Sequence, residues 1–174
     1  MLKLFGTVLL LTALNACKTA EPLATVDSVD LEKFMGDWYV IANIPTPLEV
    51  QAYNPIESYR LNQDGSVATT FAFNKGGFDE ERKVYHPTGF VVDDTGNAVW
   101  DMQFLWPFKA DYRIVYLDDT YETTIIGRNR RDYVWIMARS PRITKPEYDE
   151  LVSKVAAMGY STELLRKSPH SFQD

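Results

Sequence analysis

Cysteine and histidine, two residue types that often carry nucleophilic and acid–base chemistry, are rare in this chain of 174 residues. Cys17 is the only cysteine, and the two histidines are His86, which precedes a proline, and His170, near the end of the chain. A nucleophile needs an adjacent base that activates it, and neither histidine belongs to a pattern that resembles a catalytic triad or a metal cluster. We therefore expect no catalytic residues, no bound metal and no cofactor.

The sequence before the lone cysteine suggests a different chemistry for it. An apolar run from Leu4 to Leu14 follows Lys3; it is shorter than the ~20 apolar residues of a membrane-spanning helix and is typical of a secretion signal. Leu14-Asn15-Ala16-Cys17 resembles the bacterial lipobox, in which the signal is cut before the cysteine and the thiol is acylated. We expect a lipoprotein signal peptide over 1–16, lipidation of Cys17 and a lipidated tether over 17–30. The alternative is an ordinary signal peptide followed by a buried or free thiol.

Composition limits the remaining possibilities. With 45% hydrophobic and 24% charged residues, the chain is typical of one globular domain that can bury a sizeable core. The net charge of −6 argues against non-specific binding of nucleic acid. Three arginines gather at Arg128, Arg130 and Arg131, and we interpret this cluster as a solvated turn.

The elements that would position a site are mostly strands. Aromatic and β-branched residues recur in short runs separated by turn residues such as Asp64-Gly65. These runs predict strands over residues 38–44, 57–61, 67–73, 84–92, 98–104, 112–117, 121–127 and 133–139. Because hairpins join most of them, we expect an all-β fold, an eight-stranded up-and-down antiparallel β-barrel whose interior can hold one small ligand.

One helix and one long loop complete the expected architecture. Thr144 and Glu147 fit a capping box, with Pro146 in the first turn and Gly159 after the last. A single apolar stripe predicts that this C-terminal α-helix packs outside the barrel, through Tyr148, Leu151, Val152 and Val155. The loop from Pro45 to Pro55 has no clear period, and we expect it to cover the open end of the barrel.

Three motifs in this order resemble those of the lipocalins. They are Gly36-Asp37-Trp38-Tyr39 at the first strand, Leu117-Asp118-Asp119-Thr120-Tyr121 before the seventh, and Arg139 at the end of the eighth. The chain is most similar to the bacterial lipocalins, outer-membrane lipoproteins related to animal apolipoprotein D, to which Arg139-Ser140-Pro141 also corresponds. The resemblance implies a lipocalin domain over 31–174, located at the outer membrane.

Gly36, Trp38 and Arg139 are expected to form the structural signature of this fold. An indole at one end of a barrel needs a cover, and a guanidinium can stack on it while donating to nearby carbonyl groups. This end of the barrel should therefore be closed, and the mouth should lie at the opposite end, near the long loop.

Strand alternation then gives the candidate ligand-binding residues. If Arg139 points inwards, residues two apart on its strand share that face, and similar counts apply to the other strands. The expected barrel lining is Phe71, Phe73, Trp100, Met102, Phe104, Tyr112, Ile114, Tyr116, Trp135 and Met137. The alternative is that these side chains fill the barrel and leave no cavity.

The family resemblance implies the function. We expect a lipid-binding protein that holds a fatty acid or lysophospholipid, with the chain inside the barrel, the head near the mouth and Tyr112 as a candidate polar anchor, for lipid storage, transport or scavenging in the cell envelope. The expected partners are this lipid and the membrane, through the N-terminal lipid anchor; nucleic acid is not expected, and a homodimer is left open. The alternatives are a structural or interaction lipoprotein without a ligand and, less favoured, a lipocalin-fold enzyme.

Overall fold

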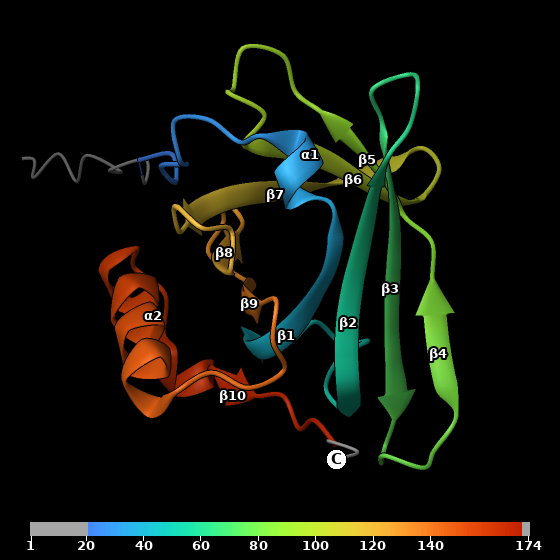
Figure 1. Ribbon diagram of the computed structural model, residues 1–174, viewed down its shortest axis with the longest axis vertical. Coiled ribbons are helices and arrows are strands. Elements are labelled where there is room, and N and C mark those ends of the chain that lie inside the picture. Colours follow the sequence, from blue (N-terminus) through green and yellow to red (C-terminus); the bar gives the residue numbers. More distant parts are fainter. Residues whose placement is uncertain (1–20, 172–174) are drawn as a thin grey trace, which may run out of the picture.

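The computed structural model describes residues 21–171, and its strands form one antiparallel sheet that closes on itself (Figure 1). Strands that are neighbours along the chain pair with one another around the barrel, apart from two that share one position, and the last barrel strand pairs with the first. This confirms the expected all-β, eight-stranded up-and-down barrel. Its strands are β1 (Gly36–Ile44), β2 (Ala52–Leu61), β3 (Val67–Lys75), β4 (Arg82–Tyr85), β5 (Thr88–Val91), β6 (Val99–Leu105), β7 (Phe108–Leu117), β8 (Thr123–Gly127) and β9 (Val134–Ala138).

Two differences from the expected strands occur at prolines. The strand expected over 84–92 is divided into β4 and β5 around Pro87, which has no N–H to donate; both halves pair with β3 and together fill one position of the barrel. By contrast, β2 begins before Pro55, which we expected to lie in a loop. The pairing of β2 with β3 shifts register between Tyr53 and Ile56, and such a bulge tolerates a proline.

The helices lie at one end and on one side of the barrel. The expected outer helix is α2 (Lys145–Ala157), which begins with the complete capping box of Thr144 and Glu147. Two shorter elements were not expected: α1 (Leu31–Phe34) at the end where β1 begins, and η1 (Thr162–Leu164). A single turn is too short to show a helical period. Within the described chain, no helix is both long and apolar enough to span a membrane.

The segment before α1 is packed on the barrel. Leu23 and Val29 are almost completely buried, and the amide of Val26 donates a hydrogen bond of 3.0 Å to the carbonyl of Ile114 on β7. Residues 21–30, which we expected to belong to a tether, are therefore part of the folded domain. The earlier part of that segment and Cys17 lie outside the described residues.

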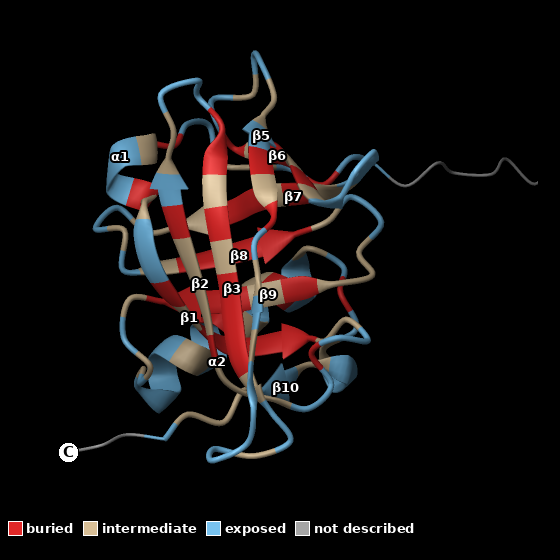
Figure 2. Ribbon diagram, turned by 90° about the vertical axis from the view of Figure 1, so that its right-hand side faces the viewer, coloured by how far each residue is buried: buried red, intermediate tan, exposed pale blue. Residues whose placement is uncertain are grey.

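The core has an inner and an outer part. The inner part fills the end of the barrel next to α1 and contains Phe34, Trp38, Tyr59 and Trp100. The outer part lies between the barrel and α2, whose Leu151 and Val155 are buried there. Figure 2 shows the buried residues along the strands and the exposed ones mainly in the turns. The strands therefore carry apolar side chains on both faces wherever α2 covers them.

A bulge in β7 changes which of its side chains point into the barrel. The pairing of β7 with β8 shifts register between Ile114 and Tyr116. Ile114 lies in the inner core, whereas Val115 and Tyr116 pack in the outer one, where the ammonium of Lys154 on α2 lies 4.6 Å from the Tyr116 ring centroid. The prediction that Tyr116 lines the barrel is therefore wrong, because the extra residue reverses the alternation.

The C-terminal segment closes a gap between β1 and β2. These strands pair only through the first half of β1, and the second half pairs with β10 (Arg166–Lys167) instead. The amide of Ser168 donates to the carbonyl of Ile41, and the amide of Asn54 on β2 donates to the carbonyl of Pro169, each at 2.9 Å. The segment therefore bonds to both edges of the gap.

Candidate functional site

One end of the barrel is closed by Trp38 and Arg139. The Arg139 guanidinium carbon lies 3.8 Å from the centroid of the fully buried Trp38 ring, and the indole N–H donates to the carbonyl of Phe34 at 2.9 Å. Gly36 has a φ of +94°, and a Cβ there would lie 3.4 Å from Nη1 of Arg139. The guanidinium donates to five backbone carbonyls, at 2.7–3.3 Å, those of Lys33, Phe34, Met35, Asp37 and Tyr121.

These contacts explain why α1 sits on this end. Three of the five carbonyls belong to the last turn of α1 and its C-cap, where the carbonyls have no partner within the helix. The guanidinium therefore donates hydrogen bonds to helix carbonyls that lack partners in the helix, and it also covers the indole. Burial lowers the pKa of Arg139. This geometry matches the structural role that the sequence predicts for the pair.

A cavity of about 100 Å³ lies beyond this closed end. Its walls come from the inward faces of the strands and from the loop between β1 and β2, and most of them are apolar. The lining residues are Thr46, Leu48, Glu49, Glu57, Phe71, Met102, Phe104, Ala110, Asp111, Tyr112, Arg128 and Trp135. The barrel is thus filled at one end and hollow at the other.

Half of the predicted barrel lining borders this cavity. Five predicted residues do so: Phe71, Met102, Phe104, Tyr112 and Trp135. Four others are fully buried and do not border it, namely Phe73, Trp100, Ile114 and Met137. For Trp100, Ile114 and Met137, the alternative of side chains that fill the barrel describes the structure better, because all three lie in the inner core, where the rings of Phe34 and Tyr59 pack onto Trp100. Phe73 packs against the rings of Phe71 and Tyr85 instead. Ligand binding by the five stays a prediction.

The loop between β1 and β2 lies at the mouth and is fixed by Glu49. One carboxylate oxygen of Glu49 accepts a hydrogen bond of 2.9 Å from the amide of Thr46, and the other accepts one of 2.7 Å from the indole of Trp135 on β9. Both oxygens are therefore occupied within the protein. Leu48 of the same loop borders the cavity, and its side chain is 49% exposed.

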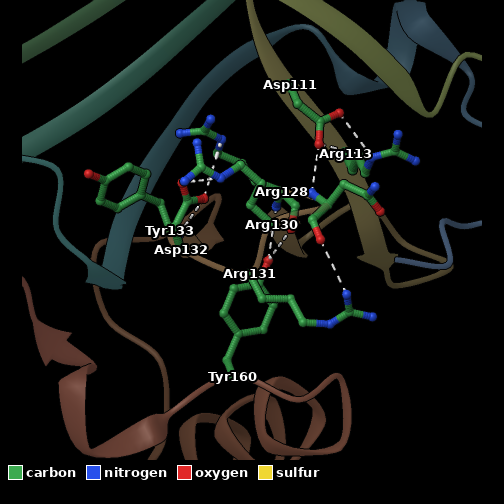
Figure 3. A network of polar contacts seen from close by, with 9 residues as sticks. Asp111, Arg113, Arg128, Arg130, Arg131, Asp132, Tyr133 and Tyr160 are labelled. Atoms are coloured by element: carbon green, nitrogen blue, oxygen red, sulfur yellow. Dashed lines mark hydrogen bonds and ion pairs between the residues drawn. The ribbon is translucent and has the colours of Figure 1, made fainter. Parts of the chain in front are cut away.

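A network of charged residues borders the mouth at the turn between β8 and β9 (Figure 3). Arg128 lies in this turn and lines the cavity, which corrects our interpretation of the arginine cluster as a purely solvated turn. Its Nε lies 3.5 Å from a carboxylate oxygen of Asp132, and its guanidinium carbon lies 5.3 Å from the centroid of the Tyr133 ring. Asp111 also lines the cavity, but it accepts from the side chain of Arg113 at 2.9 Å and from the amide of Asn129 at 2.6 Å.

A carboxyl group and two phenols meet at the inner end of the cavity. The hydroxyl of Tyr59 donates to Oε2 of Glu57, and its oxygen lies 2.8 Å from that of Tyr112. Burial raises the pKa of Glu57 to about 7, the negative charge of Glu49 raises it as well, and the hydrogen bond from Tyr59 opposes this change. Burial also raises the pKa of both tyrosines.

The lining predicted from the sequence does not include Glu57, Glu49 or Arg128. A signal was available for Glu57, because it lies two residues before Tyr59 on one strand and alternation places both on the same face. No comparable pattern marks Glu49 or Arg128, which lie in irregular turns.

The arrangement has the form of a binding site. Apolar walls with a few polar groups are typical of sites for small apolar or amphipathic molecules. Within residues 21–171, no group of three or more histidine, cysteine or acidic side chains could hold a metal ion. The two histidines do not line the cavity: His86 contacts Thr70 on the surface, and a ring nitrogen of His170 lies 2.9 Å from the carbonyl of Val40.

The rim of the mouth carries exposed apolar side chains. The hairpin of β6 and β7 presents four of them at and next to its turn, with exposed fractions of 55–80%: Phe104, Leu105, Trp106 and Phe108. Leu48 and Val50 are about half exposed on the loop between β1 and β2. Exposed apolar groups that gather in this way usually mark an interaction surface.

Comparisons with known proteins agree with this architecture. Residues 29–170 match the family described as lipocalin-like domain. The chain is 29% identical to temperature-induced lipocalin-1 of Arabidopsis thaliana, with 86% of this chain and 83% of the relative aligned. It is 26% identical to outer membrane lipoprotein Blc of Escherichia coli K12, with 83% of each chain aligned.

Solved structures show the same fold at low sequence identity. Insecticyanin from the tobacco hornworm Manduca sexta is similar with a TM-score of 0.64 and 16% identity, covering 88% of this chain and 89% of its own. Apocrustacyanin C2 has a TM-score of 0.65 and 11% identity, covering 82% and 80%. With a family match over most of its length and a closed eight-stranded barrel, this chain belongs to the lipocalin-like domain family.

Proposed function

We propose that this protein is a membrane-anchored lipid-binding protein that holds a fatty acid or lysophospholipid in its barrel. The observation that carries the proposal is the cavity, which is walled by apolar side chains such as Phe71 and Met102 and lies beyond a tightly closed end. Membership of the lipocalin-like domain family supports the binding of a small hydrophobic ligand. Storage, transport or scavenging of lipids in the cell envelope would all use this property.

The size of the cavity indicates how a lipid would be accommodated. Its volume of about 100 Å³ is below the ~300–1,000 Å³ of typical small-molecule sites. A long acyl chain would therefore extend through the mouth or displace the rim. Phe104 and Leu48 border the cavity and are about half exposed, so that their side chains have room to move.

The position of the N-terminal segment supports a membrane anchor close to the mouth. The carbonyl of Glu21 accepts a hydrogen bond of 3.2 Å from Arg131, which lies in the turn between β8 and β9 at the mouth. Glu21 follows Cys17 by four positions, a distance of at most ~14 Å in an extended chain. A lipid on Cys17 would hold the mouth near the bilayer, where exposed apolar residues such as Trp106 could contact it.

The expected location follows from the relatives. Outer membrane lipoprotein Blc of Escherichia coli and its counterpart in Citrobacter freundii carry their location in their names, at 26% and 25% identity. We propose the same location for this chain, with the lipidated Cys17 as its anchor. Mass spectrometry of the protein extracted from outer membranes would test this, because a signal peptide that is still attached or an unmodified thiol would contradict it.

Native mass spectrometry tests the binding itself. Purified protein mixed with fatty acid or lysophospholipid should show one bound lipid per chain. The variant Ala110→Phe, which places a ring in the cavity, should lose the complex, whereas Ala156→Phe on the exposed face of α2 should retain it. If neither lipid binds the unaltered protein at micromolar concentration, the proposal is wrong, and the filled half of the barrel then favours a structural or interaction role without a ligand.

A further inference from the structure

Glu57 is the most unusual residue of the cavity wall. It lies on β2 at the boundary between the filled end of the barrel and the hollow one, and it borders the cavity. Its Oε2 accepts a hydrogen bond from Tyr59, while its Oε1 has no hydrogen-bond partner within residues 21–171. A carboxyl oxygen with unused acceptor capacity is thus located at the inner end of an otherwise apolar cavity.

The other glutamate of the cavity does not share this property. Glu49 accepts one hydrogen bond at each carboxylate oxygen, from the amide of Thr46 and from the indole of Trp135. Its acceptors serve to hold the loop at the mouth. Of the two glutamates that line the cavity, Glu57 is therefore the one with a carboxyl oxygen that can accept a hydrogen bond from a ligand.

The direction of the hydrogen bonds determines whether Glu57 and its neighbours can donate hydrogen bonds to a ligand or accept them from it. The single hydroxyl proton of Tyr59 is given to Glu57, so the hydrogen bond between the two phenols must be donated by Tyr112. Both phenolic protons thus point along the chain of hydrogen bonds towards the carboxyl group. When Glu57 is ionised, the inner end of the cavity offers acceptors and no donor.

The groups around Glu57 also disfavour an anionic ligand group at the inner end of the cavity. The groups that act on its pKa are Tyr59 on the same strand and Glu49 on the loop, and neither is a cation. Tyr112 faces it from β7, β3 contributes the apolar side chain of Phe71 to the cavity wall, and Val40 of β1 lies in the inner core.

The two charged groups at the mouth do not alter this conclusion. Arg128 borders the cavity at the turn between β8 and β9, where it pairs with Asp132, and Asp111 is bonded to Arg113. An anionic ligand group at the inner end would therefore meet a carboxylate without a compensating cation.

We propose that Glu57 is the residue that determines ligand specificity in this cavity: it reserves the inner end for a hydrogen-bond donor, such as a hydroxyl or ammonium group, and excludes a carboxylate. The inference rests on the proposed function, because it requires that the cavity hold an amphipathic lipid. It narrows the ligand class to lipids with a neutral or cationic donor at the end that enters the barrel, which reverses the orientation expected from the sequence, where the head lies near the mouth. A fatty acid would enter this way in its neutral form.

Three ligands with the same twelve-carbon chain test the proposal: dodecylamine, dodecanol and dodecanoate. Their dissociation constants would be measured by calorimetry with the purified protein at about pH 8.5 and about pH 5.5, on either side of the Glu57 pKa of about 7. At the higher pH, dodecylamine should bind at least about tenfold more tightly than dodecanoate, because like charges brought together in a dry site repel strongly. Dodecanol should bind at both pH values.

Two variants connect the preference to one side chain. Glu57→Gln removes the charge and should reduce the difference between dodecylamine and dodecanoate to about threefold or less at the higher pH. Glu163→Gln removes the same charge from an exposed position that does not line the cavity, and it should keep the full difference. In the unaltered protein, the difference should also shrink at the lower pH, which tests the proposal without a variant.

The outcomes separate this inference from the proposed function. Equal binding of all three ligands to the unaltered protein at the higher pH, or a preference that survives in Glu57→Gln, would overturn the role of Glu57 and leave lipid binding intact. Failure of every ligand to bind would overturn both.

Discussion

Replacing Trp38 by alanine tests whether the closed end holds the barrel together. The side chain is fully buried, its ring centroid lies 5.0 Å from that of Phe34, and its N–H donates to the Phe34 carbonyl. Truncating a buried aromatic residue of this kind costs ~3–5 kcal/mol. The loss also exposes the apolar side of the Arg139 guanidinium, which lies 3.8 Å from the ring centroid.

This free energy corresponds to a measurable shift. For a domain of this size, a change of 1 kcal/mol in the free energy of unfolding moves the melting temperature by ~2–4 °C, so that Trp38→Ala should melt roughly 6–20 °C lower. Circular dichroism during heating measures the midpoint, and urea titration measures the free energy itself.

The chain provides a matched control for the same chemical change. Trp106 is 80% exposed in the turn between β6 and β7, and Trp106→Ala should alter the free energy of unfolding by no more than ~0.5 kcal/mol. Unfolding of the two variants at the same midpoint would contradict the stabilising role of Trp38, because burial and contacts would then not distinguish the two indoles.

Three further changes have defined outcomes. Arg139→Lys should lower the free energy of unfolding by about 2–3 kcal/mol in a urea titration, because an ammonium cannot reach five carbonyls and stack on an indole together; unchanged stability would contradict this. Thr144→Ala removes the capping box of α2 and should cost about 1 kcal/mol, whereas Ser161→Ala, at the N-cap of η1 where the side chain makes no capping hydrogen bond, serves as the comparison. Glu57 binds its proton more tightly in the folded state, with a pKa of about 7 against an ordinary 4.5. The folded protein should therefore lose up to about 3 kcal/mol of stability as pH rises from about 4.5 to 7. Glu57→Gln should lose less stability over this range, and parallel profiles of stability against pH for the two proteins would show that Glu57 is not the cause.

Much of the fold could be predicted because its signals are local. Alternation of apolar residues, turn residues such as Asp64-Gly65 and the capping box at Thr144 each specify structure within a few residues, and the barrel follows from their order. The contact of Trp38 with Arg139 joins residues 101 positions apart in sequence, and it was available because the family resemblance gave their roles.

The site was harder to predict because it depends on packing between distant strands. One extra residue in β7 moves Tyr116 to the outer face, and no local signal marks that bulge. Trp100 faces inwards as expected, yet its ring stacks on Tyr112 at 5.0 Å and fills the space that we expected to be free. Strand alternation gives the face of a residue but not the volume that its neighbours leave.

The hydrogen bonds of the C-terminal segment have a consequence for how the protein is made. Residues 166–170 join β1, near the beginning of the chain, to β2 across the gap between them. These residues follow every barrel strand in the sequence, so neither strand edge of the gap is covered until they have been synthesised. An unpaired strand edge is a site for pairing with another chain. A stop codon before residue 166 should therefore yield a protein whose newly made molecules associate with one another, even though every barrel strand is present.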